Sequence, residues 1–413
     1  MRADGLAMGR VWGLCAALAL YGLWSAPAPP VPGMAEMLIG ALLLAGVGVR
    51  PLTAATGQTL REPAVPHWQG LATVAFAWLL WAPLLRGVAL GWEWAAILRD
   101  VVPLVFLFLP VLLVPVLRRV AGAAVPLLAA ALALAGVLFA LRWWQQAGWA
   151  FDAVGARAMA EGAAYLLNAP SVLFAAVALP MAALGLAARG GWWRWAAALV
   201  LLAAAALCLG ALTAAVHRMA LAAAVIGMLA TLPWWWRRAP RAVLVAVVLA
   251  VLGVAVAGDA VAGAVALAAE KTRLVGANAR LDEAAAVLEQ VAGSLPALLF
   301  GEGWGAAFAN PAVGGWRVGY THTLLSYALL KGGLFGVLAV LVYLAGLAPA
   351  ALALLRAQPP LAVSVLAPLA LAVGGHTAYK YLDCGILLTV LVLSAERHMP
   401  IGRRMDLDGS DRV

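Results

Sequence analysis

Three side chains in this sequence combine charge or hydrogen-bonding capacity with a position beside an apolar segment. His322 precedes the glycine-punctuated run TLLSYALLKGGLFG. An unperturbed imidazole is mostly neutral at pH 7 and can accept a proton from a hydroxyl group, which is general-base chemistry. Arg218 and Arg280 each carry a permanently charged planar fork that matches phosphate oxygens. These residue types can accept a proton and bind an anionic group.

The elements that position these residues belong to a membrane protein. The chain has 413 residues, of which 66% are hydrophobic and 11% charged, and its mean hydropathy is +0.99. A soluble domain is about half apolar and about a quarter charged. The apolar runs are continuous and rich in Ala and Leu, whereas a membrane barrel shows short segments of alternating polarity. The sequence therefore predicts an all-α polytopic membrane protein.

Twelve apolar segments are predicted to be transmembrane helices, because each approaches the length needed to cross a bilayer. They cover residues 9–25, 34–49, 70–86, 100–117, 121–141, 166–187, 193–213, 219–236, 241–258, 333–355, 359–375 and 382–396. The first 28 residues also resemble a signal peptide. A retained helix is preferred, because it gives an even number of spans and agrees with the sidedness of every later connection. The chain is accordingly divided into residues 1–258, 259–332 and 333–413.

Basic residues in the short connections fall on one face, which is cytoplasmic by the positive-inside rule. They include Arg50, Arg61, Arg118, Arg119, Arg189, Arg194, Arg237, Arg238, Arg241 and Arg356. Both termini are therefore predicted to be cytoplasmic. The net charge of +9 reflects this topology, so no nucleic-acid partner is expected, although the charge also favours anionic membrane lipids. The three scattered cysteines predict neither a disulfide framework nor a metal cluster.

The segment 259–332 is unusually long for a connection and faces the periplasm in this topology. Within it, NARLDEAAAVLEQVAG predicts a helix with Leu281, Ala285, Leu288 and Ala292 on one apolar face. The acids Asp282, Glu283 and Glu289 are interpreted as surface charges of this helix. The glycines of LLFGEGWGAAF predict a tight irregular turn, and Glu302 in that turn stays open as a rival base.

Positive charges also gather at the predicted outer boundary, where the positive-inside rule disfavours them. These are Arg86, Arg99, Arg142, Arg157, Arg218 and Lys380. Each alone can be explained by an ion pair or a snorkelling side chain. Together they predict an anionic ligand at the outer leaflet. The spans themselves contain very few charges, which argues against a proton-driven transporter.

The order of these features resembles the O-antigen ligase and polymerase superfamily. The matching features are an arginine in a tight outer hairpin, the arginine-led helix GANARLDEAAAVLEQ, the segment LLFGEGWG, and a histidine before a glycine-spaced span. In ligases of that superfamily the histidine is followed by Asn, Ser or Gln, nine residues, Gly, two residues, and Gly, Thr or Val. Here Thr323 follows His322, and Gly333 and Gly336 keep the spacing. Thr323 departs from the ligase pattern, and His217 stands where relatives usually carry a small residue.

The resemblance implies an inverting, metal-independent glycosyltransferase without a cofactor. It implies a donor glycan on undecaprenyl pyrophosphate and an acceptor hydroxyl on lipid A core or another glycan. It places the protein in the bacterial inner membrane with a periplasmic active site. Arg218 and Arg280 would bind the diphosphate, and His322 would act as the base. The Asp406–Asp408 pair in the tail is not expected to hold a metal, because it lies on the cytoplasmic side.

Several alternatives stay open. Trp304, Arg317 and Tyr320 are candidate sugar or acceptor contacts, although interfacial aromatics also form belts in any membrane protein. His322 could instead cap the following helix. Ligation is favoured over polymerisation by the histidine motif alone, and protein O-glycosylation uses similar residues. The hypothesis from another class is a flippase or transporter of lipid-linked oligosaccharides.

Overall fold

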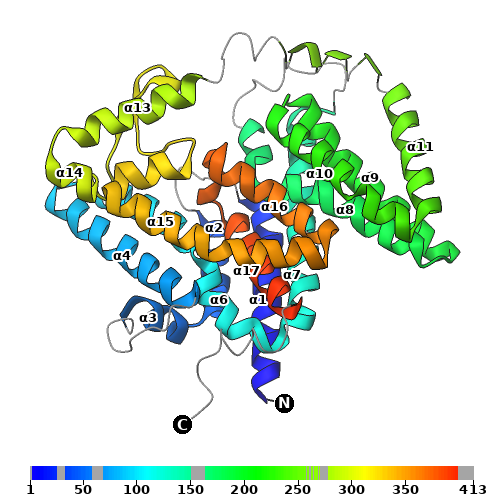
Figure 1. The fold of residues 1–413 in the computed structure, drawn as a ribbon, viewed down its shortest axis with the longest axis horizontal. Helices are drawn as coiled ribbons and strands as arrows, with labels where there is room; N and C mark the ends of the chain where they lie inside the picture. The colour runs from blue at the N-terminus through cyan, green and yellow to red at the C-terminus, as the bar shows by residue number, and fades with distance from the viewer. Residues whose placement is uncertain are drawn as a thin grey trace.

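The computed structural model describes residues 2–25, 33–57, 68–149, 163–256 and 278–398, with short pieces between 258 and 269. The longer helices are α1 (Arg2–Trp24), α2 (Met34–Val47), α3 (Val49–Gly57), α4 (Trp68–Ala89), α5 (Trp94–Leu107), α6 (Leu109–Leu117), α7 (Ala121–Gln146), α8 (Pro170–Ala188), α9 (Trp192–Ala214), α10 (Arg218–Arg238), α11 (Pro240–Val256), α13 (Asn278–Ala292), α14 (Leu295–Phe300), α15 (Leu324–Ala357), α16 (Pro359–Gly374) and α17 (Leu382–His398). Figure 1 shows these helices packed side by side in one bundle.

Each of the twelve predicted spans coincides with helical structure. Among the described residues, seven helical segments are long and apolar enough to cross a membrane. They are Asp4–Trp24, Trp68–Ala89, Leu109–Gln146, Pro170–Ala188, Trp192–Ala214, Arg218–Arg238 and Leu324–Ala357. Three further apolar helices, α2, α11 and α16, are shorter. The helical, multi-pass character is therefore confirmed, while the count of twelve spans and the cytoplasmic termini stay predictions.

The segment predicted as a periplasmic loop contains more regular structure than expected. Strand β1 (Phe308–Asn310) pairs antiparallel with β2 (Trp316–Val318), with Ala309 opposite Arg317. Helix α15 begins at Leu324, nine residues before the predicted start of the tenth span, and the predicted boundary at residue 333 coincides with a break in the helical backbone. The helix continues to Ala357 through a kink at Gly333, whose φ of 62° lies in the left-handed region that favours glycine.

The most deeply packed helix is α17, in which every residue from Leu382 to Ala395 is buried. Figure 1 shows it near the middle of the bundle, with α11 at the edge. Only Ala242 and Val243 are buried on α11.

Contacts between helix ends define two opposite faces of the bundle. Near one face, Arg10 of α1 donates to the Val47 carbonyl at the end of α2, and Arg118 pairs with Glu396 of α17 at 2.9 Å. Near the other, Arg142 of α7 donates to the Ser25 carbonyl just after α1. We call this second face the loop face, because α13 and the start of α15 lie there, away from the N-terminus in Figure 1.

A small apolar cluster fixes α13 over the start of α15. Val287 of α13, Phe308 of β1 and Leu330 of α15 are each 0–1% exposed and pack together. The strand ribbon thus contributes Phe308 to the packing between the two helices. This packing also holds the segment around His322, which lies two residues before α15.

Candidate active site

The candidate active site centres on a pair formed by His322 and Glu283. The Nδ1 atom of His322 lies 2.5 Å from Oε2 of Glu283, and the backbone N–H of His322 donates to Oε1 at 2.6 Å. Glu283 is only 1% exposed. One buried carboxylate therefore fixes both the backbone and the ring of His322, and the shielded surroundings strengthen these bonds.

The buried face of α13 differs from the predicted one. Glu283, Val287 and Val291 face the protein at four-residue spacing and are almost fully buried. Leu281 and Leu288, the main members of the predicted apolar face, are 69% and 50% exposed. The helix itself is confirmed, but the interpretation of Glu283 as a surface charge is wrong. The side chain turns inward because its carboxylate is paired with His322.

The geometry leaves one ring nitrogen of His322 available. Because Nδ1 faces a carboxylate, we assign its hydrogen to the bond with Glu283, which leaves a lone pair on Nε2. Nε2 has no hydrogen-bond partner among the described residues, and the side chain keeps 27% exposure. A base oriented by a third group is the arrangement that activates hydroxyl nucleophiles.

The alternative role of His322 as a helix cap is wrong. Thr323 is the N-cap of α15, and its hydroxyl accepts a hydrogen bond from the Ser326 N–H at 3.2 Å. The same hydroxyl donates to Ser326 Oγ at 2.8 Å. His322 is therefore free of a capping role.

Arg280 lies one turn before Glu283 on α13. Its Nη1 donates to the sulfur of Met219 at 3.4 Å, and the side chain is partly exposed. A thioether is a weak acceptor, whereas a guanidinium binds carboxylates and phosphates strongly. Among the described residues, no carboxylate forms an ion pair with Arg280. This guanidinium is thus well placed to bind an anionic ligand.

Arg218 begins α10, directly before Met219. The hairpin from α9 to α10 is as tight as predicted, with α9 ending at Ala214 and Val216 held at a φ of 53°. This left-handed conformation is uncommon for a β-branched residue. Arg218 lies next in the chain to Met219, the residue that Arg280 contacts. The structure therefore brings the elements that carry Arg218, Arg280 and His322 together at the loop face.

Two further histidines adjoin this cluster. The rings of His217 and His376 have centroids 6.5 Å apart. Burial, together with the neighbouring His217, His322 and Arg280, lowers the pKa of His376 to about 3. Its Nδ1 is buried without a hydrogen-bond partner among the described residues. The sequence does not identify His376 as part of this cluster, because its neighbours His217 and His322 are distant from it in the chain.

The three predicted sugar or acceptor contacts differ in their positions relative to the site. Trp304 is 2% exposed, and its indole N–H donates to the Leu79 carbonyl at 3.1 Å. The expectation that it stacks on a sugar is therefore corrected, since it packs in the core. The ring of Tyr320 lies 6.2 Å from that of His322, centroid to centroid. Arg317 is exposed on β2 and donates to the Ala307 carbonyl at 2.9 Å. Tyr320 thus adjoins the site, and Arg317 lies on the nearby ribbon.

The six predicted outer cations separate into distinct groups. Arg86 donates to the Gly301 carbonyl, and Arg142 to the carbonyls of Gly22 and Ser25 at 2.9 and 2.6 Å. These two hold chain segments together. Arg157 lies outside the described residues. Arg218 belongs to the cluster around Met219, and Arg99 and Lys380 lie at a second cluster, described below.

Glu302, the rival base, takes part in the junction between α14 and α15. Its backbone N–H donates to the Leu330 carbonyl at 2.8 Å, and its own carbonyl accepts from the indole of Trp92 at 2.8 Å. These bonds are made by the main chain and give the carboxylate no link to His322.

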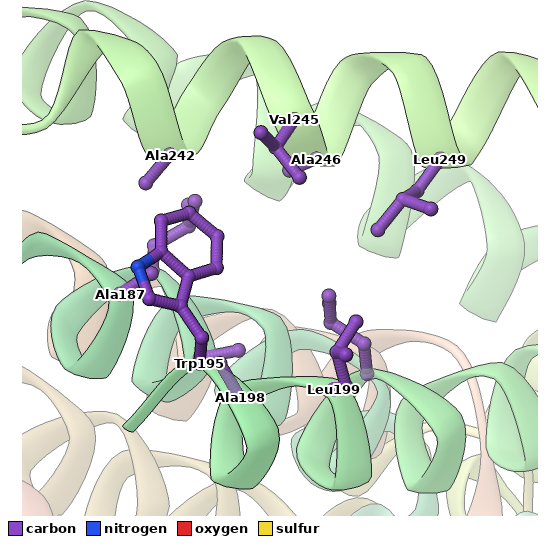
Figure 2. Close-up of a pocket in the computed structure, with 11 residues that line it drawn as sticks. Ala187, Trp195, Ala198, Leu199, Ala242, Val245, Ala246 and Leu249 are labelled. Atoms are coloured by element: carbon purple, nitrogen blue, oxygen red, sulfur yellow. The ribbon is translucent and has the colours of Figure 1, made fainter. Parts of the chain in front are cut away.

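An apolar pocket lies away from these polar groups. Figure 2 shows Trp195, Ala198 and Leu199 facing Ala242, Val245, Ala246 and Leu249 across a gap between α9 and α11. Its lining contains no charged or acidic group. In the described part of the chain, no group of three or more His, Cys, Asp or Glu side chains could hold a metal ion.

Comparison of the chain with family models, with curated proteins and with solved structures finds no match.

Proposed function

We propose that this chain is a membrane glycosyltransferase that moves a glycan from a polyprenyl diphosphate to a hydroxyl acceptor. The observation that carries the proposal is the buried pairing of Glu283 with His322, one helical turn from Arg280. Within the described residues, His322 Nε2 is unbonded, which suits an alcohol nucleophile, and Arg280 bonds only a thioether, which suits a phosphorylated leaving group.

The reaction follows from these positions. His322 Nε2 accepts the proton of the acceptor hydroxyl while its oxygen attacks the anomeric carbon. The bond between that carbon and the diphosphate oxygen breaks, and the electron pair leaves with the diphosphate. Attack from the face opposite the leaving group inverts the anomeric centre. Glu283 stabilises the imidazolium that forms, and Arg280 with Arg218 balances the charge that develops on the leaving group.

The resemblance to the O-antigen ligase and polymerase superfamily narrows the proposal. We infer a donor carried on undecaprenyl pyrophosphate, a periplasmic loop face and a place in the bacterial inner membrane. The spacing from His322 to Gly333 and Gly336 favours ligation to lipid A core. Glycan polymerisation and protein O-glycosylation use the same chemistry with another hydroxyl, so they differ only in the acceptor.

A reconstituted transfer reaction tests the proposal. Purified protein is mixed with a polyprenyl-diphosphate-linked glycan and a core-lipid acceptor, without ATP and with a chelator, and the product is identified by mass spectrometry. We expect the glycan joined to the acceptor with inverted anomeric configuration. Absence of product from wild-type protein with every available acceptor, together with movement of the intact donor across proteoliposomes, would support the transporter hypothesis instead.

A further inference from the structure

A second polar cluster lies beside the catalytic pair and has no role in the mechanism above. It surrounds Asp100 of α5, which is 4% exposed. Lys331 of α15 is completely buried and pairs with Asp100 Oδ2 at 2.5 Å. The hydroxyl of Tyr327 donates to Oδ1 at 2.8 Å, and the Gly305 N–H donates to Oδ2 at 2.9 Å. The carboxylate of Asp100 therefore forms an ion pair with Lys331 and accepts hydrogen bonds from two neutral donors.

Two more cations adjoin this cluster. Arg99 precedes Asp100 and is exposed. A Cβ atom added to Gly319 would lie 3.7 Å from Nη2 of Arg99 and 3.6 Å from Nζ of Lys331, so both cations reach the segment that leads to His322. Lys380 belongs to the short helix η6 (Thr377–Lys380), and its Nζ lies 3.9 Å from the centroid of the Tyr327 ring.

Neither Arg99 nor Lys380 has a hydrogen bond or ion pair to an acid among the described residues. Asp100 is paired with Lys331. Glu283, the other acid nearby, is paired with His322. The Nζ atom of Lys380 lies instead 3.9 Å from the centroid of the Tyr327 ring and 5.9 Å from that of Tyr379. The cluster therefore carries more positive than negative charge.

The ionisation of Lys380 reflects this excess. Burial lowers the pKa of Lys380 to about 7, with Lys331 and Arg99 lowering it and Asp100 and Glu283 opposing them. Binding of an anion would stabilise this site. The anion would replace the water that burial removes from the Lys380 ammonium group, and it would offset the repulsion between the neighbouring cations.

We propose that Arg99 and Lys380 form a second anion-binding site, which takes a phosphate or carboxylate group carried by the acceptor. The acceptor assignment rests on the proposed function. Arg280 contacts Met219, the chain neighbour of Arg218, whereas Lys380 lies over the Tyr327 ring and Arg99 reaches Gly319 beside Lys331. The leaving diphosphate and an anionic acceptor would thus occupy different cation pairs.

The second site is connected to the catalytic histidine. Tyr379, which precedes Lys380, donates through its hydroxyl to the Thr321 carbonyl at 3.1 Å, and its ring lies 5.4 Å from that of Tyr327. Thr321 directly precedes His322. An anion held by Arg99 and Lys380 would therefore tether the acceptor beside the base that activates it.

The small number of lysines allows a direct test. The chain contains only Lys271, Lys331 and Lys380. Full-length protein in phosphatidylcholine nanodiscs is treated at pH 7 with an amine-reactive ester, and the labelling rate of each lysine is measured by peptide mass spectrometry. We expect glucose 6-phosphate, but not glucose, to slow labelling of Lys380. A rise of about one pKa unit from 7 lowers the neutral fraction at pH 7 about fivefold.

Variants separate specific binding from general charge effects. Protection is expressed as the ratio of rates with and without glucose 6-phosphate within each variant. We expect Arg99→Gln to abolish protection and Arg99→Lys to retain part of it. Arg356→Gln, which removes an exposed cation at the far end of α15, should leave protection unchanged. Labelling of Lys271 in the same sample controls for consumption of the reagent.

Three results would overturn the proposal: no labelling of Lys380 without ligand, equal rates with and without the sugar phosphate, or full protection in Arg99→Gln.

Nanodiscs containing phosphatidylglycerol distinguish the source of the anion. If that lipid alone protects Lys380 and the sugar phosphate adds nothing, a lipid headgroup is the ligand and the acceptor assignment is wrong. Protection without glycan transfer would refute the proposed function and with it the acceptor assignment, but not the anion site, whereas transfer without protection would refute only this site.

Discussion

Glu283 carries charge in a position where charge is costly. Its carboxylate is almost fully buried, and each oxygen meets a donor of His322. Burial of an unpaired carboxylate would cost several kcal/mol, so removal of either partner leaves the other in an unfavourable state. The pair therefore orients the imidazole with little freedom, which is what a base needs when its lone pair must point at one hydroxyl.

The contact of Arg280 with Met219 gives a test of the diphosphate site. Replacing Arg280 with Gln should raise the KM for the lipid-linked donor about tenfold or more, because a charged hydrogen bond contributes about 1.5–3 kcal/mol. Met219→Leu removes the sulfur acceptor but keeps a similar volume, and it should change this KM less than about twofold. Steady-state kinetics measure both. Equal effects of the two substitutions would mean that Arg280 serves only to pack against Met219.

His376 makes stability depend on pH. The unfolded ring takes up a proton near its ordinary pKa of 6.5, whereas the folded ring resists protonation until about pH 3. Acid therefore favours the unfolded state, and this contribution to stability is lost as pH falls from about 6.5 towards about 3. His376→Asn should show a smaller drop in the thermal unfolding midpoint between pH 7 and pH 5 than the wild type.

His398 provides the matched control for that measurement, because it is an exposed histidine at the end of α17. His398→Asn should keep the pH dependence of the wild type. If the two variants show the same pH dependence, the burial of His376 does not determine it.

The junction between α14 and α15 holds the start of α15 in place. Gly301 and Gly333 approach each other so closely that a Cβ on Gly333 would lie 2.5 Å from the Gly301 nitrogen. The Glu302 and Gly303 N–H groups donate to the carbonyls of Leu330 and Lys331. These bonds use carbonyl groups that the kink at Gly333 releases from the helix.

Gly333→Ala should therefore disrupt this junction. The methyl group would meet backbone atoms, and φ of 62° adds strain of about 1–3 kcal/mol for a non-glycine residue. We expect a thermal unfolding midpoint lowered by several degrees and a loss of transfer activity. Gly40→Ala, in α2, meets no atom within 4 Å and should be neutral or slightly stabilising. An unchanged midpoint for Gly333→Ala would contradict the packing described.

The helices were predictable from the sequence, whereas the partners of the site residues were not. Continuous apolar runs identify helices, and the position of α13 follows from its own pattern. The orientation of α13 does not, because Leu281 and Leu288 can face a lipid environment as readily as a protein core. The contact between Glu283 and His322 spans 39 residues, and that between Asp100 and Lys331 spans 231. Such pairs depend on tertiary packing and leave no local periodicity.

Successive helices end on opposite sides of the bundle, so the whole molecule has two distinct faces. The His322–Glu283 pair, the Met219 cluster and the Asp100 cluster all belong to the loop face, while Arg118 and Glu396 lie towards the opposite one. A donor with its tail in the membrane and its diphosphate at headgroup level would meet the polar groups at a single boundary. This arrangement agrees with chemistry that takes place at one membrane surface.

Cysteine labelling tests the orientation of these faces. Leu288 on α13 is 50% exposed, and Arg356 near the far end of α15 is exposed. The native Cys208 and Cys384 are buried, so they should contribute little background. We expect a membrane-impermeant maleimide to label Leu288→Cys in intact spheroplasts and Arg356→Cys only after permeabilisation. The reverse pattern would place the proposed active site in the cytoplasm.

The rate of glycan transfer by Glu283→Gln tests the catalytic pair most directly. The amide has nearly the same shape but no charge, so the imidazolium loses its stabilising partner. We expect kcat to fall about 10²- to 10⁴-fold, as for loss of a general base, with the KM for the donor little changed. Glu289→Gln alters an exposed acid on the same helix and should retain wild-type kcat. Equal kcat values for the two folded variants would contradict the assignment of His322 and Glu283 as the catalytic pair.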